Sequence, residues 1–310
     1  MILRYIFSYQ APPKRSYAKA SDKTVRMSRQ SLALFCLFIS SSLSSFADVI
    51  FQSVVDHTIN GQKEFAIVVP TYNNSRFCIA NIESLITQKY DNYHVYIIND
   101  ASTDETYEKL TAYIIDHACE DLVTLINNSE RVGALANYYR VISSLEDHVI
   151  VLNVDGDDWL AHEDVLSTLN NVYDDHNIWL TYGQFKQYPS GEIGFCRSIS
   201  GDVIEHHNYR KSEWLSTHLR TYYAWLFKKI DSNDLYYNGH FMRACGDRAL
   251  MYPMLEMCAG HFACIQDVLY IYNCANPLAD VRVNLQEQQK MCRYICSLKR
   301  YKPLNSILLH

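Results

Sequence analysis

The chain has 310 residues and a formal net charge of −6 at neutral pH, and it is long enough to bury a substantial core. Basic residues dominate the first 47 positions, whose net charge is +6, so residues 48–310 carry −12. This acidic body excludes a basic stripe for nucleic acid, and we expect no nucleic-acid partner. We expect a leader over residues 1–47 and a single domain over residues 48–310.

Residues 27–47 have the order of a secretory signal peptide. A short polar start precedes the apolar stretch 32–39, and a Ser-rich segment ends the leader at Ala47. The apolar stretch is too short for a membrane span, so we expect membrane association only through the leader, as a signal anchor. We favour a secreted or membrane-anchored protein over a cytoplasmic one, with Met27 as the candidate start. A transit peptide that begins at Met1 and a disordered N-terminus are the alternatives.

From residue 64 the apolar pattern predicts alternating strands and helices. Apolar runs bounded by polar residues predict five strands, at 64–69, 94–99, 122–126, 148–154 and 178–182. Amphipathic spacing predicts the helices between them, at 75–88, 106–117, 132–145 and 160–173. Ser102 and Glu105, three positions apart, have the spacing of a capping box before the second helix. This alternation predicts an α/β protein with a mostly parallel sheet and helices on both faces.

Beyond residue 184 the pattern becomes irregular. Ser190 and Gly191 predict a hairpin turn. The segments that we expect to be helical are 211–219, 223–230, 246–259 and 284–301.

Polar residues follow the ends of four predicted strands. Right-handed crossovers place these ends along one edge of the sheet. The four ends are 70–73, Asp100, 127–133 and Asp155-Gly156-Asp157-Asp158. Three carboxylates in four positions repel one another unless a cation or solvent separates them, and Mg²⁺ or Mn²⁺ takes such ligands together with phosphate oxygens. This edge therefore predicts a metal–phosphate site, with a solvated acidic turn as the alternative.

The ten cysteines include no C-x-x-C pair. Cys292 and Cys296 are four apart on one face of a predicted helix, but a zinc site would need two further ligands. We interpret the cysteines as buried reduced thiols.

At this point the chain resembles glycosyltransferase family 2, the inverting transferases of GT-A fold, over residues 64–273. The segments that carry the resemblance are Pro70-Thr71-Tyr72-Asn73, Asn99-Asp100-Ala101-Ser102-Thr103-Asp104, Asp155-Gly156-Asp157-Asp158 and Gly246-Asp247. The resemblance implies a GT-A, Rossmann-like sheet with a nucleotide half at 64–183 and an irregular acceptor half at 184–310. It also implies a hexosyltransferase-type enzyme that moves a sugar from a nucleotide-diphosphate sugar, with a UDP-sugar expected, to a glycan, lipid-linked or protein acceptor.

The resemblance implies a role for individual residues. Those implied to bind the donor are Pro70, Thr71, Tyr72, Asn73, Asp100, Gly133, Asn137, Asp155 and Arg220. Asp157 is implied to contact Mn²⁺ or Mg²⁺ directly, with Asp158 beside it, so that the metal stabilises the leaving diphosphate. Arg220 suits the diphosphate because a guanidinium binds phosphate through two hydrogen bonds, although an ordinary ion pair is the alternative.

Asp247 is the candidate catalytic base for the acceptor hydroxyl. The family commonly has Glu-Asp at this place, whereas this chain has Gly246-Asp247. A carboxylate in the first turn of a helix is also favoured by the macrodipole alone, which is the alternative explanation. Glu256 and Asp267 are the other candidates for the base.

Three rival functions are weighed against this one. A sugar nucleotidyltransferase would need a Gly-rich basic loop after the first strand, and residues 70–73 do not form one. A dinucleotide oxidoreductase is disfavoured because no G-x-G-x-x-G occurs among the ten glycines. A non-catalytic nucleotide-sugar-binding relative would have no need of a carboxylate at position 247.

Overall fold

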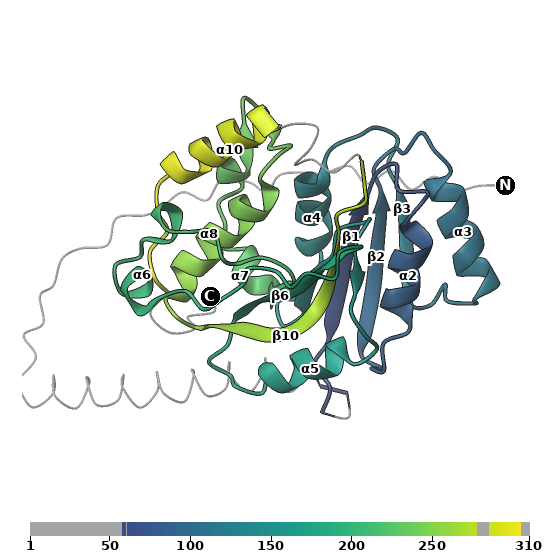
Figure 1. The fold of residues 1–310 in the computed structure, drawn as a ribbon, viewed down its shortest axis with the longest axis horizontal. Coiled ribbons are helices and arrows are strands. Elements are labelled where there is room, and N and C mark those ends of the chain that lie inside the picture. Colours follow the sequence, from purple (N-terminus) through teal and green to yellow (C-terminus); the bar gives the residue numbers. More distant parts are fainter. Residues whose placement is uncertain (1–57, 60, 278–284, 305–310) are drawn as a thin grey trace, which may run out of the picture. The chain divides into compact units, whose positions relative to one another are not determined.

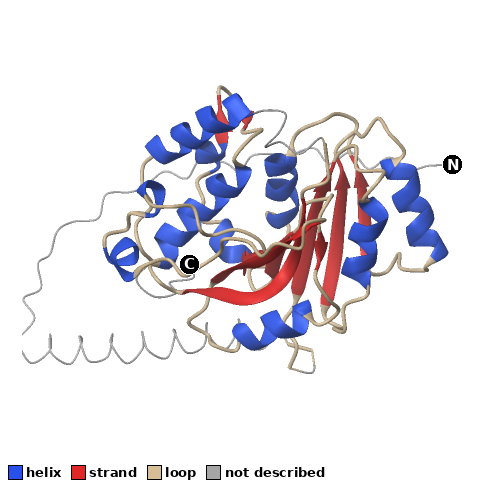
Figure 2. Ribbon diagram, viewed as in Figure 1, coloured by secondary structure: helices blue, strands red, loops and turns tan. Residues whose placement is uncertain are grey.

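The computed structural model describes residues 58–59, 61–277 and 285–304, which belong to one compact unit spanning Val49–His310. Within these ranges, eight strands form a sheet in the order β3-β2-β1-β4-β7-β6-β10-β5, and helices cover both faces (Figures 1 and 2). The leader predicted at 1–47 lies outside the described residues, so its role stays a prediction. No helix in the described ranges is long and apolar enough to cross a membrane.

The first half of the chain builds the parallel part of the sheet. Its strands are β1 (Phe65–Thr71), β2 (Tyr93–Asn99), β3 (Val123–Asn127) and β4 (Ile150–Asn153). The helices that connect or follow them are α2 (Cys78–Ile86), α3 (Thr106–Asp116), α4 (Ala134–Ile142) and α5 (Val165–Val172). Pairing of β1 with β2 and β4, and of β2 with β3, is parallel, which confirms the predicted alternation with small shifts at the element ends.

β1 lies at the centre of the core and is buried along its whole length. Phe65, Ile67 and Val69 pack in one cluster with residues of α2, α3 and α5, whereas Val68 packs in the other cluster with α4. Because neighbouring residues of a strand face opposite sides of the sheet, burial on both sides requires an uninterrupted apolar run. The uninterrupted apolar run of β1 therefore indicates a strand that is covered on both faces.

The capping box predicted before α3 is wrong. The helix begins at Thr106, and its N-cap residue, Glu105, makes no capping hydrogen bond through its side chain. Ser102 Oγ instead accepts a hydrogen bond of 2.9 Å from the backbone N–H of Asn73, and the Asp104 carboxylate accepts one of 3.0 Å from Ser75 N. These polar side chains join the loops that follow β1 and β2, and the other oxygen of Asp104 accepts a hydrogen bond of 3.0 Å from Thr106 N at the start of the helix.

The second half extends the same sheet with strands of mixed direction. β6 (Leu180–Tyr188) is longer than predicted, and β10 (Phe262–Asn273) runs parallel to it. β7 (Arg220–Tyr223) is antiparallel to both β4 and β6, and β5 (Trp159–Leu160) is antiparallel to β10.

The helix predicted at 211–219 is wrong. Only a short 3₁₀ turn, η1 (Tyr209–Lys211), forms there, and the chain then runs into β7. The strand forms because β4 and β6 offer backbone partners on both sides, which local propensity does not reveal. The remaining elements are α6 (Gly201–Glu205), α7 (Ala224–Phe227), η2 (Ser232–Leu235), β8 (Tyr236–Tyr237), β9 (His240–Phe241), α8 (Gly246–Cys258) and α10 (Leu285–Ser297).

A disulfide joins Cys245, at the start of α8, to Cys292 of α10. The expectation of reduced thiols is therefore wrong for these two residues. Six other cysteines of the described ranges carry free thiols, namely Cys78, Cys119, Cys196, Cys258, Cys264 and Cys296. The spacing in the sequence concealed the bridge because the two partners come from different helices, 47 residues apart.

A buried ion pair holds η1, α8 and α10 together. Arg210 donates from Nε to Glu256 Oε1 at 2.7 Å and from a terminal nitrogen to Oε2 at 2.8 Å, and both side chains are almost fully buried. Arg210 also donates to the carbonyl of Ile295 in α10 at 2.7 Å.

We expect Glu256→Ala to lower the free energy of unfolding by about 3–5 kcal/mol, because it leaves the Arg210 charge buried without its counter-charge. Chemical denaturation measures the change. Glu213→Ala is the matched control, since the Arg197–Glu213 pair is exposed, and it should change stability by less than about 1 kcal/mol. Equal losses in the two variants would contradict a stabilising role of the buried pair.

Candidate active site

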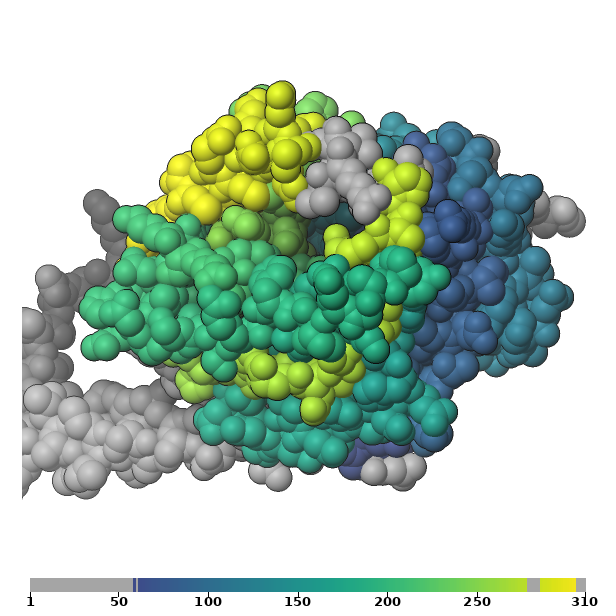
Figure 3. Space-filling model, in the orientation of Figure 1, coloured from purple at the N-terminus to yellow at the C-terminus, as the bar shows by residue number. Residues whose placement is uncertain are grey.

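The polar residues predicted at one edge of the sheet do meet there. The backbone N–H of Asp100 donates to the carbonyl of Thr71 at 2.9 Å, and Asn128 N donates to the carbonyl of Asn99 at 2.9 Å. These bonds join the carboxyl ends of β1, β2 and β3. In the space-filling view, the surface is hollowed between the yellow C-terminal helix and the yellow-green end of β10 (Figure 3).

Asp100 organises the turn that leads into α4. Its Oδ1 accepts hydrogen bonds from Val132 N at 3.0 Å and Asn128 Nδ2 at 2.8 Å, and its Oδ2 accepts one from Gly133 N at 2.8 Å. Burial opposes ionisation, but these donors outweigh it and lower the pKa of Asp100. Gly133 has a φ of +94°, which glycine adopts without strain. The carboxylate therefore shapes this loop, and its implied role in binding the donor stays a prediction.

Tyr72 presents an aromatic surface beside this loop. The guanidinium of Arg131 lies 3.8 Å from the centre of the Tyr72 ring. Asn73 has a φ of +52°, and its Oδ1 accepts a hydrogen bond of 2.8 Å from the backbone of Thr103. Asn137 is buried and accepts one of 2.9 Å from the amide of Asn128. Asn73 and Asn137 thus hold the loops in place. Tyr72 is the predicted donor-binding residue whose aromatic ring suits stacking against a nucleotide base.

The acidic turn after β4 lies against the end of β1. Asn81 of α2 donates from Nδ2 to the carbonyls of Asp155 at 3.2 Å and Asp158 at 2.7 Å, which sets the shape of the turn. A Cβ atom added to Gly156 would lie 2.5 Å from Thr71 Oγ1 and 2.9 Å from the carbonyl of Pro70. Only glycine therefore fits at the second position of the turn.

We expect Gly156→Ala to destabilise the protein by about 1–3 kcal/mol, because the added methyl group displaces the acidic turn from β1. Nucleotide affinity should fall as well, since the carboxylates move with the turn. Thermal unfolding and calorimetric titration with UDP measure the two effects. Gly201→Ala is the control, since nothing lies within 4 Å of its added Cβ, and unchanged UDP affinity in Gly156→Ala would contradict the assignment of this turn to the site.

Asp158 is held by the last strand of the sheet. Its Oδ1 accepts a hydrogen bond of 2.7 Å from Asn273 N, and its Oδ2 accepts one of 2.8 Å from the Tyr270 hydroxyl. Burial raises the pKa of Asp158 well above its ordinary value, and the nearby charges of Asp157 and Asp155 raise it further. A cation close to this turn would offset that repulsion.

One group among the described residues has the geometry of a metal site: Asp155, Asp158 and His218 offer ligand atoms that all lie within 4.8 Å of one another. Two carboxylates and an imidazole form a donor set that suits Mn²⁺, and the carboxylates also suit Mg²⁺. Asp157, predicted as the direct ligand, is not part of this group, and its Oδ2 accepts a hydrogen bond of 2.6 Å from Asn276 Nδ2. Its metal contact stays a prediction.

His218 is a residue of this group for which the sequence predicted no role. Its ring stacks on Tyr270 and Tyr272, with centroids 4.8 and 5.2 Å away, and its Nε2 lies 3.5 Å from Asp155 Oδ2. Burial lowers the pKa of His218, with Arg220 adding to the effect, which favours the neutral imidazole that binds metals. Its position two residues before Arg220 was the available signal, but the sequence did not show that a strand begins at Arg220.

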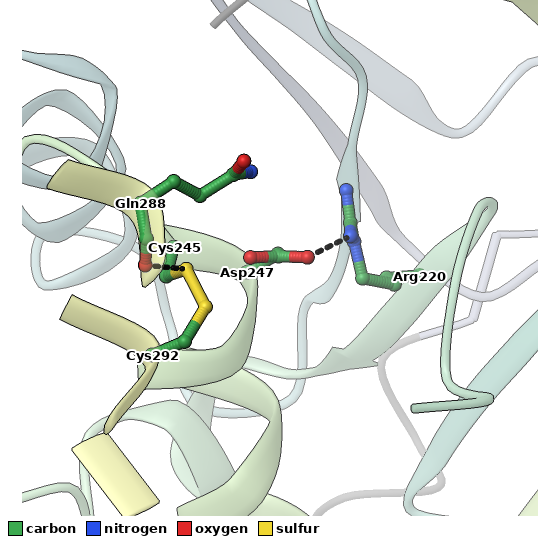
Figure 4. Close-up of a disulfide and its surroundings, with 5 residues drawn as sticks. All are labelled: Arg220, Cys245, Asp247, Gln288 and Cys292. Atoms are coloured by element: carbon green, nitrogen blue, oxygen red, sulfur yellow. Dashed lines mark hydrogen bonds and ion pairs between the residues drawn. A yellow bond between two sulfur atoms is a disulfide. The ribbon is translucent and has the colours of Figure 1, made fainter. Parts of the chain in front are cut away.

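Arg220 and Asp247 complete the arrangement. Arg220 is buried at the start of β7, and its two terminal nitrogens lie 3.9 Å from Asp155 Oδ2 and 3.5 Å from Asp247 Oδ2. Figure 4 shows the Asp247 carboxylate directed toward Arg220, beside the disulfide of Cys245 and Cys292. The first turn of α8 thus brings the candidate base to the acidic edge of the sheet.

The alternative bases are less suitable. Glu256 is fully buried in its pair with Arg210, and its Oε2 also accepts a hydrogen bond of 2.9 Å from Tyr301 N, so it is unsuited to receive a proton from an acceptor. Asp267 is exposed at an irregularity of β10, between Ile265 and Val268. Asp247 is the candidate that faces the acidic turn.

Comparisons with known proteins agree with this arrangement. The family model described as glycosyl transferase family 2 matches residues 66–236. Glycosyltransferase GlyG from Streptococcus pneumoniae is 24% identical over 217 residues, which make up 67% of this chain and 69% of GlyG.

Solved structures show the same fold. S. aureus TarS in complex with UDP-GlcNAc matches with a TM-score of 0.51 and 18% identity, over 69% of this chain and 59% of TarS. Glucosyl-3-phosphoglycerate synthase from Mycobacterium tuberculosis matches with a TM-score of 0.51 and 13% identity, over 80% of this chain and 84% of the synthase. These likenesses confirm the expected GT-A fold. With more than half of its length matched by the family model, the protein belongs to glycosyl transferase family 2 and is a glycosyltransferase.

Proposed function

We propose that the protein transfers a sugar, with inversion, from a nucleotide-diphosphate sugar to an acceptor hydroxyl in a metal-assisted displacement. The observation that carries the proposal is the position of Arg220 between Asp155 and Asp247, which sets a candidate base beside a candidate metal site. A non-catalytic relative or a nucleotidyltransferase would not need a carboxylate in this position.

The carboxyl edge of the sheet is suited to bind the nucleotide-diphosphate sugar. Tyr72 offers a ring on which a base stacks, and the loop anchored by Asp100 lies beside it. A divalent cation held by Asp155, Asp158 and His218, with Asp157 next to them, would offset the charge that collects on the diphosphate as it leaves.

We expect the nucleotide to be UDP. TarS was determined with UDP-GlcNAc, and the mycobacterial synthase with UDP and Mn²⁺, which supports this choice for a chain of the same fold. The acceptor is a glycan, a lipid-linked sugar or a protein.

Asp247, Arg220 and the disulfide have separate roles on the acceptor side of the reaction. Asp247 takes the proton of the acceptor hydroxyl while the sugar–phosphate bond breaks on the opposite face of the anomeric carbon. Arg220 orients the Asp247 carboxylate through one terminal nitrogen, and its other terminal nitrogen brings positive charge close to Asp155. The disulfide of Cys245 and Cys292 anchors the helix start from which Asp247 projects.

A screen of nucleotide sugars for hydrolysis and transfer, with Mn²⁺, with Mg²⁺ and with a chelator, tests the proposal. We expect turnover of a UDP-sugar that depends on the added cation, and GDP-sugars serve as the comparison. Turnover that the chelator leaves unchanged would contradict metal assistance, and retention of the anomeric configuration in the product would contradict inversion.

We also propose that the chain works in an oxidising compartment, reached through residues 27–47. The Cys245–Cys292 disulfide supports this, since such bonds persist mainly outside the cytosol. Expression of the full chain with a C-terminal tag should give protein in the medium or the membrane fraction. A chain recovered in the cytosol with both thiols reduced would contradict the proposal.

A further inference from the structure

Two free cysteines meet near the start of β10, at the end of the strand opposite to Tyr270 and Asn273. The sulfur atoms of Cys196 and Cys264 lie 3.6 Å apart, although the residues are 68 positions apart in the chain. A disulfide bond has a length of about 2.05 Å, so the two sulfur atoms must approach each other further to form one.

The backbones of both cysteines are anchored to β6. Cys264 is the neighbour of Tyr182 where β10 pairs with β6, which Figure 1 shows side by side. The carbonyl of Cys196 accepts a hydrogen bond of 3.2 Å from Gln184 Nε2, and Ile199 N donates to the Tyr182 hydroxyl at 3.0 Å. The segment that contains Cys196 and Ile199 is thus hydrogen-bonded to β6, next to β10, and these contacts keep the two sulfur atoms close together.

The surroundings distinguish the two thiols. Cys196 is only 4% exposed, whereas Cys264 is half-buried and accepts a hydrogen bond of 2.9 Å from Gln266 Nε2. A hydrogen bond from the Cys196 thiol lowers the pKa of Cys264 to about 6, although burial opposes this effect. The same hydrogen bond, together with burial, raises the pKa of Cys196. Since the thiolate is the nucleophile, Cys264 is suited to attack and Cys196 to follow.

We propose that Cys196 and Cys264 form a redox-active dithiol that small disulfides such as oxidised glutathione convert into a second disulfide of this chain. The Cys264 thiolate attacks one sulfur of the small disulfide, which leaves a mixed disulfide on Cys264 and expels a small thiolate. Cys196 then gives its proton to that thiolate and attacks the Cys264 sulfur, which expels a second small thiolate that takes a proton from solvent. Two protein sulfurs are oxidised and one small disulfide is reduced to two thiols.

Treatment of the purified full chain with oxidised glutathione, followed by alkylation and peptide mapping by mass spectrometry, tests the proposal. Wild-type protein should lose two alkylatable thiols and yield a Cys196–Cys264 cross-linked peptide. Cys196→Ser keeps a hydroxyl donor beside Cys264, so it should accumulate one glutathione at Cys264. Cys264→Ser should leave Cys196 unmodified, because the attacking sulfur is missing.

Cys119→Ser is the matched control, since Cys119 is half-buried, lies three residues after the end of α3 and has its pKa raised by burial. It should form the Cys196–Cys264 bridge as the wild type does. Cys196→Ala, checked for an unchanged thermal midpoint, guards against a folding defect in the serine variant. Glutathione spread evenly over Cys264 and the other half-buried cysteines, or a wild-type chain that keeps both thiols, would overturn the proposal. The count of alkylatable thiols and the peptide map are both independent of transferase activity.

Discussion

Asp247→Asn should lower the turnover number by about 10²- to 10⁴-fold, because the neutral amide cannot take the proton from the acceptor hydroxyl as the sugar–phosphate bond breaks. The affinity for UDP and metal should change little, since Asp247 and Asp155 pair with different nitrogens of Arg220 and only Asp155 belongs to the candidate metal group. Steady-state kinetics with the donor found in the screen gives the first quantity. Calorimetric titration with UDP and Mn²⁺ gives the second.

The control for Asp247→Asn addresses the explanation that the residue merely stabilises a helix start. Asp202 lies in the first turn of α6 and is exposed, so Asp202→Asn makes the same change of charge at a helix start that the site does not use. It should keep the parental turnover. If Asp247→Asn also transferred sugar at the parental rate, Asp247 would be only a helix-start residue, and Asp267 would be tested next.

Asp155→Asn should remove most of the gain in UDP affinity that Mn²⁺ provides, on the order of 100-fold, because a neutral amide neither offsets the charge of the cation nor matches a carboxylate oxygen as a ligand. Asp155 belongs to the candidate metal group and also lies near Arg220 and His218. Turnover should fall together with affinity, which separates this variant from Asp247→Asn. Titration of UDP with and without Mn²⁺ measures the gain.

Two further variants define the metal site. Asp157→Asn should also lose much of the gain if this carboxylate contacts the metal directly, as the resemblance implies. Asp267→Asn removes an exposed carboxylate from β10 and should keep the full gain. UDP binding that does not respond to Mn²⁺ in the parental protein, and stays the same in Asp155→Asn, would show that this acidic turn holds no metal.

The sequence by itself determined the parallel half of the sheet and the location of its polar edge. Strands such as β1 and β4 are buried on both faces, so each needs a continuous apolar run that is visible without knowledge of its neighbours. Asp100 and the acidic turn follow directly after such runs, and the chain direction alone places them at the carboxyl end of the sheet. These features are local in the chain, and local pattern is what a single sequence records.

Only the tertiary structure decided which residues complete the site. β7 forms after the predicted helix at 211–219, where no strand was predicted, because β4 and β6 supply its hydrogen-bond partners, and this strand carries Arg220 to the acidic turn. His218 reaches Asp155 for the same reason. The Cys245–Cys292 disulfide and the proximity of Asp247 to Arg220 depend on how α8 and α10 pack. Contacts between residues far apart in the chain arise from the packing of whole elements, and no spacing within one segment of the sequence encodes them.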